Sequence, residues 1–124
     1  MRAQFKRGKE ARRQRIRVNG GSGITDAVRR LVREAEPCPY CGSAATETDH
    51  IWALSRGGPD TVDNLSAICS SCNREKHARL LTEWEATPGG REKVQKAVKA
   101  NPRIRAEYER LTSTDHAPAL PTEP

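Results

Sequence analysis

The sequence predicts a small α+β domain in which two short strands are set among several helices. Three observations support this prediction. Only 35% of the 124 residues are hydrophobic and 4% are aromatic, so the chain can build one compact domain with a small core. Four cysteines occur as two Cys-x-x-Cys pairs. β-favouring runs lie between these pairs, whereas helical spacing of apolar residues is found mainly outside them.

The N-terminal part of the chain is strongly basic. Residues 1–33 have a net charge of +9, whereas residues 34–124 have a net charge of −3. We interpret residues 1–23 as a flexible basic arm with a Gly-rich linker, helical over residues 6–18 only when bound. Such an arm would bind DNA by releasing counterions from phosphates; a tail that only aids solubility is the alternative. The arm residues expected to contact DNA are Lys6, Arg7, Arg12, Arg13, Arg15 and Arg17.

The predicted domain spans residues 24–112 and begins with a helix. Thr25 or Asp26 can cap this helix, which is expected to run to about Ala35 before Pro37 ends it. Its apolar side chains fall on one face at helical spacing: Ile24, Val28, Leu31 and Val32.

Two short β-favouring runs lie between the cysteine pairs. Residues 46–53 are expected to form the first strand, and residues 62–65 a second short strand or an extended turn. The intervening residues 55–60 contain a Gly-Gly-Pro run, which a regular element cannot accommodate, so we expect a loop there.

A helix is expected directly after the second cysteine pair. Ser70 or Ser71 can cap it, and it is predicted to start near Cys72 and to continue towards Ala86. A Thr-Pro-Gly-Gly run then ends it.

The C-terminal part of the domain is also predicted to be helical. Residues 91–100 show helical spacing of apolar side chains. Asn101 followed by Pro102 is typical of a helix cap and a first-turn proline, so another helix is expected to begin there. Residues 113–124 are proline-rich and are expected to form a disordered tail.

The four cysteines indicate a structural zinc site. Two residues between the members of each pair let a tight turn direct both sulfurs to one point, so two pairs can supply four thiolates to a tetrahedral zinc. A domain with so small a core would gain folding free energy from such an ion. Two disulfides are the alternative, which the spacing disfavours. The expected zinc ligands are Cys38, Cys41, Cys69 and Cys72.

Polar residues between and after the cysteine pairs suit phosphodiester hydrolysis. His50 titrates near neutrality and could take a proton from water. Asp49 and Asn73 offer the oxygen ligands that Mg²⁺ prefers. Adjacent residues of a strand point to opposite faces, so Asp49 and His50 are expected to need a local twist or bulge to act on one phosphate.

Five motifs, in this order and spacing, resemble the HNH endonuclease family: Cys-Pro-Tyr-Cys-Gly, Asp-His-Ile, Ser-Arg-Gly-Gly, Asp-Asn-Leu and Cys-Ser-Ser-Cys-Asn-Arg-Glu-Lys. The resemblance covers residues 38–77, about a third of the chain. It implies a ββα-metal fold, a two-stranded hairpin followed by a helix, that holds one divalent cation. It also implies that His50 is the general base and that Asp49 and Asn73 are metal ligands.

The resemblance assigns roles to two further residues. Asn64 would hold the loop and help to orient His50, and His77, one turn after Asn73, is a candidate extra ligand. The implied activity is metal-dependent DNA hydrolysis, and we expect nicking or cleavage of low specificity from a chain with one such site. The expected cofactors are structural Zn²⁺ and catalytic Mg²⁺ or another divalent cation such as Mn²⁺. Further candidate phosphate contacts are Arg56, Arg74 and Lys76.

Two other functions are compatible with parts of this pattern. A zinc-ribbon module that binds DNA without catalysis would use the cysteines and the arm, and an adaptor in a DNA-packaging machine is the other alternative. Small stand-alone proteins that resemble this family often accompany phage terminases, so terminase or packaging proteins are expected partners besides DNA. No run in the sequence approaches the ~18 apolar residues of a membrane span. We therefore expect a cytoplasmic protein, in the host cytoplasm if phage-encoded.

Overall fold

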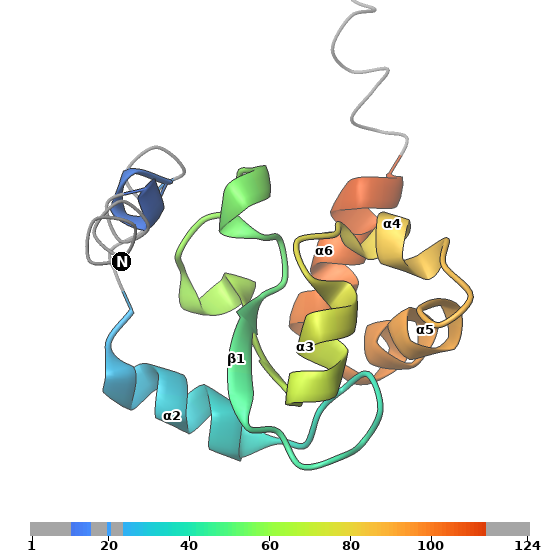
Figure 1. Cartoon of the computed structure of the whole chain (residues 1–124), viewed down its shortest axis with the longest axis horizontal. Helices are drawn as coiled ribbons and strands as arrows, with labels where there is room; N and C mark the ends of the chain where they lie inside the picture. Colours follow the sequence, from blue (N-terminus) through green and yellow to red (C-terminus); the bar gives the residue numbers. More distant parts are fainter. Residues whose placement is uncertain (1–10, 16–19, 21–23, 114–124) are drawn as a thin grey trace, which may run out of the picture.

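A computed structural model of the chain describes residues 11–15, 20 and 24–113. Within these residues a two-stranded antiparallel sheet is set among helices, which confirms the predicted α+β class (Figure 1). Predictions for Lys6, Arg7 and Arg17, for most of the linker and for the tail beyond residue 113 lie outside the described residues. None of the helices in the described ranges is long and apolar enough to cross a membrane.

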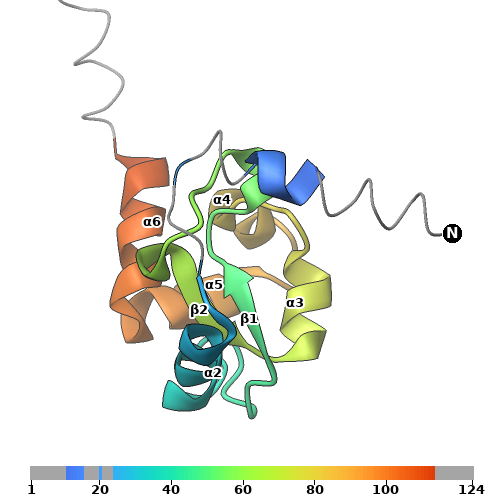
Figure 2. The same cartoon turned by 90° about the vertical axis from the view of Figure 1, so that its left-hand side faces the viewer.

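Helix α2, Asp26–Ala35, confirms the first predicted helix of the domain. It begins after Thr25, whose hydroxyl oxygen accepts a hydrogen bond from the backbone N–H of Val28 at 3.2 Å. The helix packs against both strands (Figure 2). Its apolar face is only partly covered, because Leu31 remains 67% exposed.

The sheet consists of β1, Glu47–His50, and β2, Leu65–Ile68, and His50 lies opposite Leu65. β2 has the predicted length but begins three residues later than the run predicted at 62–65, because residues 62–64 form a short 3-10 turn. β1 is shorter than the run predicted at 46–53 and ends at His50, where residues 51–52 form a bend. The reason is Asn64, whose side chain bonds both the N–H and the C=O of Trp52. These backbone groups of Trp52 therefore cannot continue the β ladder.

The single helix predicted after the second cysteine pair is wrong, because the structure has two. Helix α3, Ser70–Lys76, is capped by Cys69 rather than by either serine: the Cys69 sulfur accepts a hydrogen bond from the N–H of Cys72 at 3.4 Å. Helix α3 ends at His77, which has a φ of +53°. The chain then changes direction into α4, Leu81–Glu85, and this change lets the side chains of Leu81 and Trp84 reach the core, where they are fully buried.

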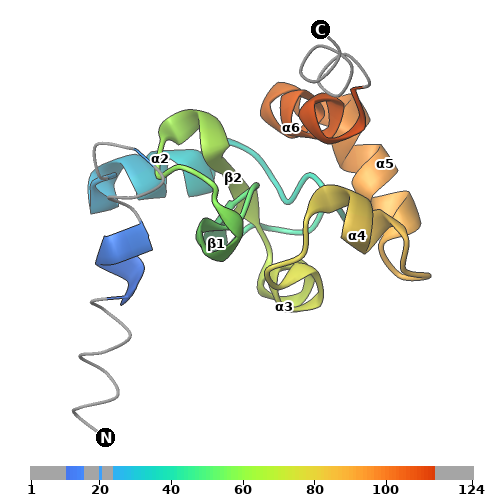
Figure 3. The same cartoon turned by 90° about the horizontal axis from the view of Figure 1, so that it is seen from above.

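Helices α5, Arg91–Ala100, and α6, Pro102–Thr112, confirm the two predicted C-terminal helices. The side-chain oxygen of Asn101 caps α6 by accepting hydrogen bonds from the N–H groups of Arg103 and Ile104, at 2.9 and 3.0 Å. Seen from above, the sheet lies between α2 on one side and the group formed by α4, α5 and α6 on the other (Figure 3).

One hydrophobic core joins the cysteine-rich loop to the C-terminal helices. The rings of Tyr40 and Trp84 lie 4.8 Å apart between centroids, and both residues are almost completely buried. The buried members of this core are Cys38, Tyr40, Ile51, Ile68, Cys69, Cys72, Leu81, Trp84, Val94, Ala97 and Ile104. The C-terminal helices therefore support the segment that holds the candidate site.

Candidate active site and cysteine cluster

The sulfur atoms of Cys38, Cys41, Cys69 and Cys72 all lie within 4.8 Å of one another. Those of Cys41 and Cys69 are 3.6 Å apart. A tetrahedral zinc with Zn–S bonds of about 2.3 Å holds its sulfurs about 3.8 Å apart. The cluster therefore fits a structural zinc. In the part of the chain that the structure describes, it is the only group of three or more His, Cys, Asp or Glu side chains with that spacing.

A bound cation would be needed to hold all four cysteines as thiolates. Burial raises the pKa of Cys38 and of Cys72, whereas hydrogen bonds from the side chain and backbone of Ser43 lower the pKa of Cys41 to about 6. Four thiolates in this partly buried cluster would repel one another without a counter-charge. A zinc ion would supply that charge and would fix the start of α3 against the loop that leads into β1.

His50, the last residue of β1, makes a short contact with a buried carboxylate. Its Nε2 lies 2.6 Å from Oδ1 of Asp60, which is 1% exposed. A carboxylate only accepts hydrogen bonds, so Nε2 carries the proton and Nδ1 keeps its lone pair. Burial lowers the pKa of His50, and the hydrogen bond to Asp60 opposes that lowering. Since the net effect lowers the pKa, the imidazole is mostly neutral at pH 7 and can accept a proton.

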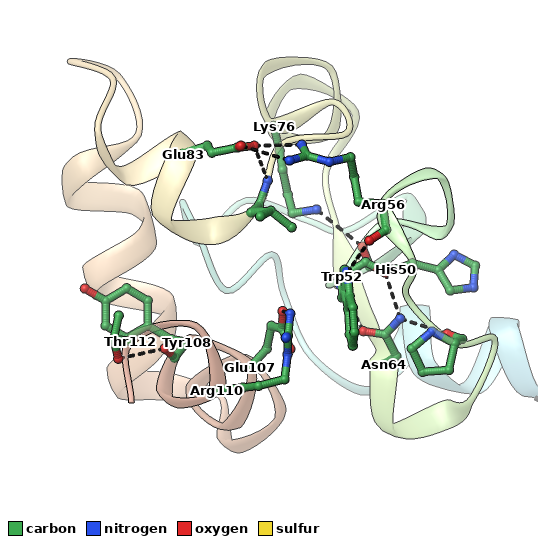
Figure 4. Close-up of polar contacts among 12 residues, drawn as sticks. His50, Trp52, Arg56, Asn64, Lys76, Glu83, Glu107, Tyr108, Arg110 and Thr112 are labelled. Carbon is green, nitrogen blue, oxygen red and sulfur yellow. Dashed lines mark hydrogen bonds and ion pairs between the residues drawn. The ribbon is translucent and has the colours of Figure 1, made fainter. Parts of the chain in front are cut away.

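Asn64 closes the loop between His50 and Asp60. Its Oδ1 accepts a hydrogen bond from the N–H of Trp52 at 2.9 Å, and its Nδ2 donates to the carbonyl oxygens of Trp52 at 2.9 Å and Pro59 at 2.8 Å (Figure 4). The loop is packed so closely that a Cβ at Gly58 would lie 1.8 Å from the Trp52 carbonyl oxygen. Asn64 thus makes the contacts expected of a residue that holds this loop.

Asp49 lies on the opposite face of β1, against α3. Its Oδ2 is 3.0 Å from Nζ of Lys76, which also donates to the His50 carbonyl oxygen at 3.3 Å. Figure 4 shows Lys76 reaching the backbone of His50 while the imidazole points away from it. Lys76 was expected to contact phosphate, but its side chain is 0% exposed, and it instead neutralises Asp49.

Lys76 and Asp49 form an ion pair, but their geometry is not that of an aligned hydrogen bond. Oδ2 of Asp49 is buried and has no hydrogen-bond partner of good geometry, although the ammonium is near. Burial raises the pKa of Asp49, and the charge of Lys76 opposes that rise. A buried carboxylate oxygen without a hydrogen-bond partner can still bind a cation.

Asn73 lies on α3 beside the same face of β1. Its Nδ2 donates a hydrogen bond to Oε1 of Glu47 at 2.7 Å, and Glu47 and Asp49 share one face because they are two residues apart in a strand. The carboxylate of Asp49 and the amide oxygen of Asn73 are the donor types that Mg²⁺ or Mn²⁺ prefers. The two residues therefore offer suitable donor types from β1 and α3, two elements that are in contact.

Asp49 and His50 border one groove of about 410 Å³ along β1. Of the twist or bulge expected at Asp49 and His50, a bulge is absent, because β1 pairs with β2 in regular register. A bulge is unnecessary because β1 forms an edge of a two-stranded sheet, so side chains from both of its faces can border the groove. The groove is lined by Arg12, Arg15, Arg29, Thr48, Asp49, His50, Ala53, Leu54 and Ser55.

Among the described residues predicted for the site, only Arg12, Arg15, Asp49 and His50 line the groove. The lining does not include Asn64, Asn73, Lys76, His77, Arg13, Arg56 or Arg74. His77 is exposed at the end of α3, where its N–H bonds the Asn73 carbonyl oxygen at 2.8 Å. Arg56 makes two hydrogen bonds to the carboxylate of Glu83, at 2.8 and 2.9 Å. Arg13 and Arg74 are exposed.

Sequence reasoning missed Asp60 and Arg29. The sequence pattern assigns Asp60 only to a turn after the Gly-Gly-Pro run, and Arg29 only to the polar side of a helix. The sequence does contain a signal for Asp60. An acidic residue at the end of a loop can lie next to the residue at the start of that loop, which here is near the candidate base His50. No comparable signal in the sequence places Arg29 beside β1.

Comparisons with known proteins identify the central segment. A family model described as HNH endonuclease matches residues 38–79. A stretch of 36 residues is 47% identical to the Type IV methyl-directed restriction enzyme EcoKMcrA of Escherichia coli (strain K12). That stretch is 29% of this chain and only 13% of the length of the relative. No solved structure gives a significant match. The resemblance of this chain to HNH endonucleases is therefore confirmed over residues 38–79.

Proposed function

We propose that the chain is a metal-dependent DNA endonuclease whose active site is the groove along β1. The observation that carries this proposal is the placement of Asp49 and His50 on the two faces of one short edge strand, both bordering the same groove. Phosphodiester hydrolysis needs a base for water and a cation where charge develops, and these two residues supply the base and a cation ligand.

His50 acts as the general base in this proposal. Oδ1 of Asp60 lies 2.6 Å from Nε2 of His50 and accepts its hydrogen bond. Nδ1 is therefore the atom that takes the proton from the attacking water. The carboxylate of Asp60 then stabilises the imidazolium that forms. Asn64 keeps the loop closed, so that Asp60 stays against His50.

Asp49 and Asn73 would hold the catalytic divalent cation, Mg²⁺ or Mn²⁺. When bound, such an ion stabilises the negative charge on the phosphate and on the leaving oxygen. Lys76 neutralises the buried Asp49 and ties β1 to α3, which keeps both ligands in place when the cation is absent. His77, exposed at the end of α3, remains a candidate extra ligand.

A structural zinc on the four cysteines forms part of the proposal. It would join the loop before β1 to the first turn of α3, which are the two ends of the segment that carries the site. With one active site per chain, cleavage of one strand at a time is expected. The packaging role, with terminase proteins as partners, stays a prediction from sequence.

The alternative is a DNA-binding module without catalysis. Such a module would use the cysteine cluster and the basic residues, but it would have no need for a buried carboxylate against His50. The contact between His50 and Asp60 therefore favours the enzyme.

A plasmid-nicking assay tests the proposal. Supercoiled DNA should become nicked with Mg²⁺ or Mn²⁺ and remain intact when neither cation is added. His50→Ala should lower the rate by about 10²- to 10⁴-fold, the usual contribution of a positioned base. Asn101→Ser serves as a control, because it changes a polar residue that does not line the groove while keeping a capping oxygen. Equal nicking by wild type and His50→Ala would contradict the proposal.

A further inference from the structure

A short helical segment of the N-terminal arm lies beside the groove. Residues 11–15 are helical, and Arg12 and Arg15 line the groove together with Asp49 and His50. Figure 2 shows this segment above the end of β1. Since the two arginines are three residues apart in a helix, they share one side of it. The segment therefore presents two guanidinium groups to the candidate active site.

A backbone hydrogen bond attaches the arm to the same loop that holds the base. The N–H of Asp60 donates to the carbonyl oxygen of Gly20 at 3.1 Å. Gly20 has a φ of +93°, a conformation that glycine adopts without strain. It lies five residues after Arg15, a reach of at most about 18 Å. The arginines are thus tethered within a short distance of His50.

The charges around the groove are unevenly distributed. Three arginines from two elements border it, namely Arg12 and Arg15 from the arm and Arg29 from α2. The carboxylate that borders it, Asp49, is already paired with Lys76 on the other face of β1. The arginine charges are therefore available for an anion in the groove, and a guanidinium matches two phosphate oxygens with parallel hydrogen bonds.

We propose that Arg12 and Arg15 are catalytic residues that bind the phosphate being cleaved, beyond any part they play in holding DNA. This inference rests on the proposed endonuclease function. In that reaction the water oxygen forms a new bond to phosphorus, and its proton passes to His50. The bond to the leaving ester oxygen breaks, that oxygen keeps the electron pair, and it takes a proton from solvent. The two guanidiniums stabilise the negative charge that builds up on the phosphate oxygens.

The arm offers a matched control for this inference. Arg13 lies between the two arginines in the same helical turn, carries the same charge and is exposed, but it does not line the groove. An arm that only tethers DNA would use all three arginines in the same way. An arm that binds the reacting phosphate depends on Arg12 and Arg15 far more than on Arg13.

The first test is single-turnover cleavage of a short duplex by the full chain with Mg²⁺, at saturating protein. Arg12→Ala and Arg15→Ala should each lower the rate constant at saturation by about 10²-fold or more, as expected when one preorganised donor to the developing charge is removed. Arg13→Ala should weaken binding and should lower the saturated rate far less than either of these variants does. Equal saturated rates for the three variants, or faster cleavage by Arg12→Ala, would overturn the inference.

A second test does not depend on cleavage. The imidazole resonances of His50 are followed by NMR while the short duplex is added without Mg²⁺ or Mn²⁺. The resonances should shift in wild type and in Arg13→Ala. At the same fraction of protein bound to DNA, they should shift much less in Arg12→Ala and in Arg15→Ala. If wild-type protein does not cleave DNA, the endonuclease function fails. The phosphate-binding part of the inference fails separately, if His50 responds equally in all variants.

Discussion

The two faces of β1 hold their polar groups in different ways. On the face towards α3, Asp49 is buried against the ammonium of Lys76, and Asn73 is bonded to Glu47. On the other face, His50 is held by one short hydrogen bond to Asp60 and borders the groove. On the first face a carboxylate is thus neutralised by an ammonium, whereas on the second face a hydrogen bond fixes the orientation of an imidazole ring. A strand of four residues can therefore keep the proposed metal ligand and the proposed base apart while both border one groove.

Loss of the cysteine cluster should disrupt both faces together and should have the largest effect. Cys72→Ser would remove one ligand of the proposed zinc and weaken the first turn of α3. We expect the loss of a large share of a stability of ~5–15 kcal/mol, because binding of a structural metal contributes directly to folding. Thermal unfolding and metal analysis measure this. Freshly purified, reduced and folded wild-type protein without zinc would contradict the expectation.

Removal of the buried ammonium should affect the face towards α3. Lys76→Met leaves the carboxylate of Asp49 buried and unpaired, so it should destabilise the protein by about 3–5 kcal/mol. Lys93→Met is the matched control, because the pair between Lys93 and Glu75 is partly exposed and should contribute less than about 1 kcal/mol. Urea unfolding of both variants provides the measurement. Equal losses of stability in the two variants would show that burial of the Lys76–Asp49 pair does not increase its contribution.

Removal of the carboxylate charge beside the base should affect the other face. Asp60→Asn should lower the cleavage rate by about 10- to 100-fold, a usual loss when the partner that orients a functional histidine is altered. Binding of DNA and of the divalent cation should persist, since Asp60 contacts neither Asp49 nor Asn73 in the structure. Single-turnover kinetics with a parallel binding assay separates the two effects. An unchanged rate would show that Asp60 does not orient His50.

The smallest effect is expected from the first residues of the arm. Deletion of residues 1–10 removes basic charge but keeps Arg12 and Arg15, so it should weaken DNA binding and leave the saturated cleavage rate unchanged. Each phosphate that the shortened arm no longer neutralises should lower the slope of log affinity against log salt by ~0.9. Binding measured at several salt concentrations tests this. An unchanged slope would exclude phosphate binding by these residues.

Local patterns predicted much of the fold. The caps at Thr25 and Asn101 and the proline after Asn101 are local signals, and the helices that follow them begin where expected. The break after His77 was not predictable, because helical spacing continues across it and tertiary packing of Trp84 decides the direction of the chain. The β1 strand also ended early, because a distant side chain, that of Asn64, takes the backbone groups of Trp52.

The candidate site was predictable to the extent that its residues belong to motifs. Asp49, His50 and the four cysteines were identified from spacing and from the resemblance to the HNH family. Lys76 was misplaced because a lysine is exposed by default, and only the fold shows that it faces Asp49. Asp60 and Arg29 reach the site through a loop and a packed helix, and single-sequence patterns do not encode such contacts.

In the proposed mechanism, one face of β1 supplies a cation ligand and the other face supplies the base. The most direct test is the cleavage rate of Asp49→Ala and His50→Ala as Mn²⁺ is raised. We predict that Asp49→Ala recovers part of its activity at high Mn²⁺, because weakened binding of the cation can be offset by its concentration. His50→Ala should stay about 10²- to 10⁴-fold slow at every concentration. Recovery of His50→Ala by Mn²⁺, or identical metal dependence in both variants, would contradict the separation of roles between the two faces.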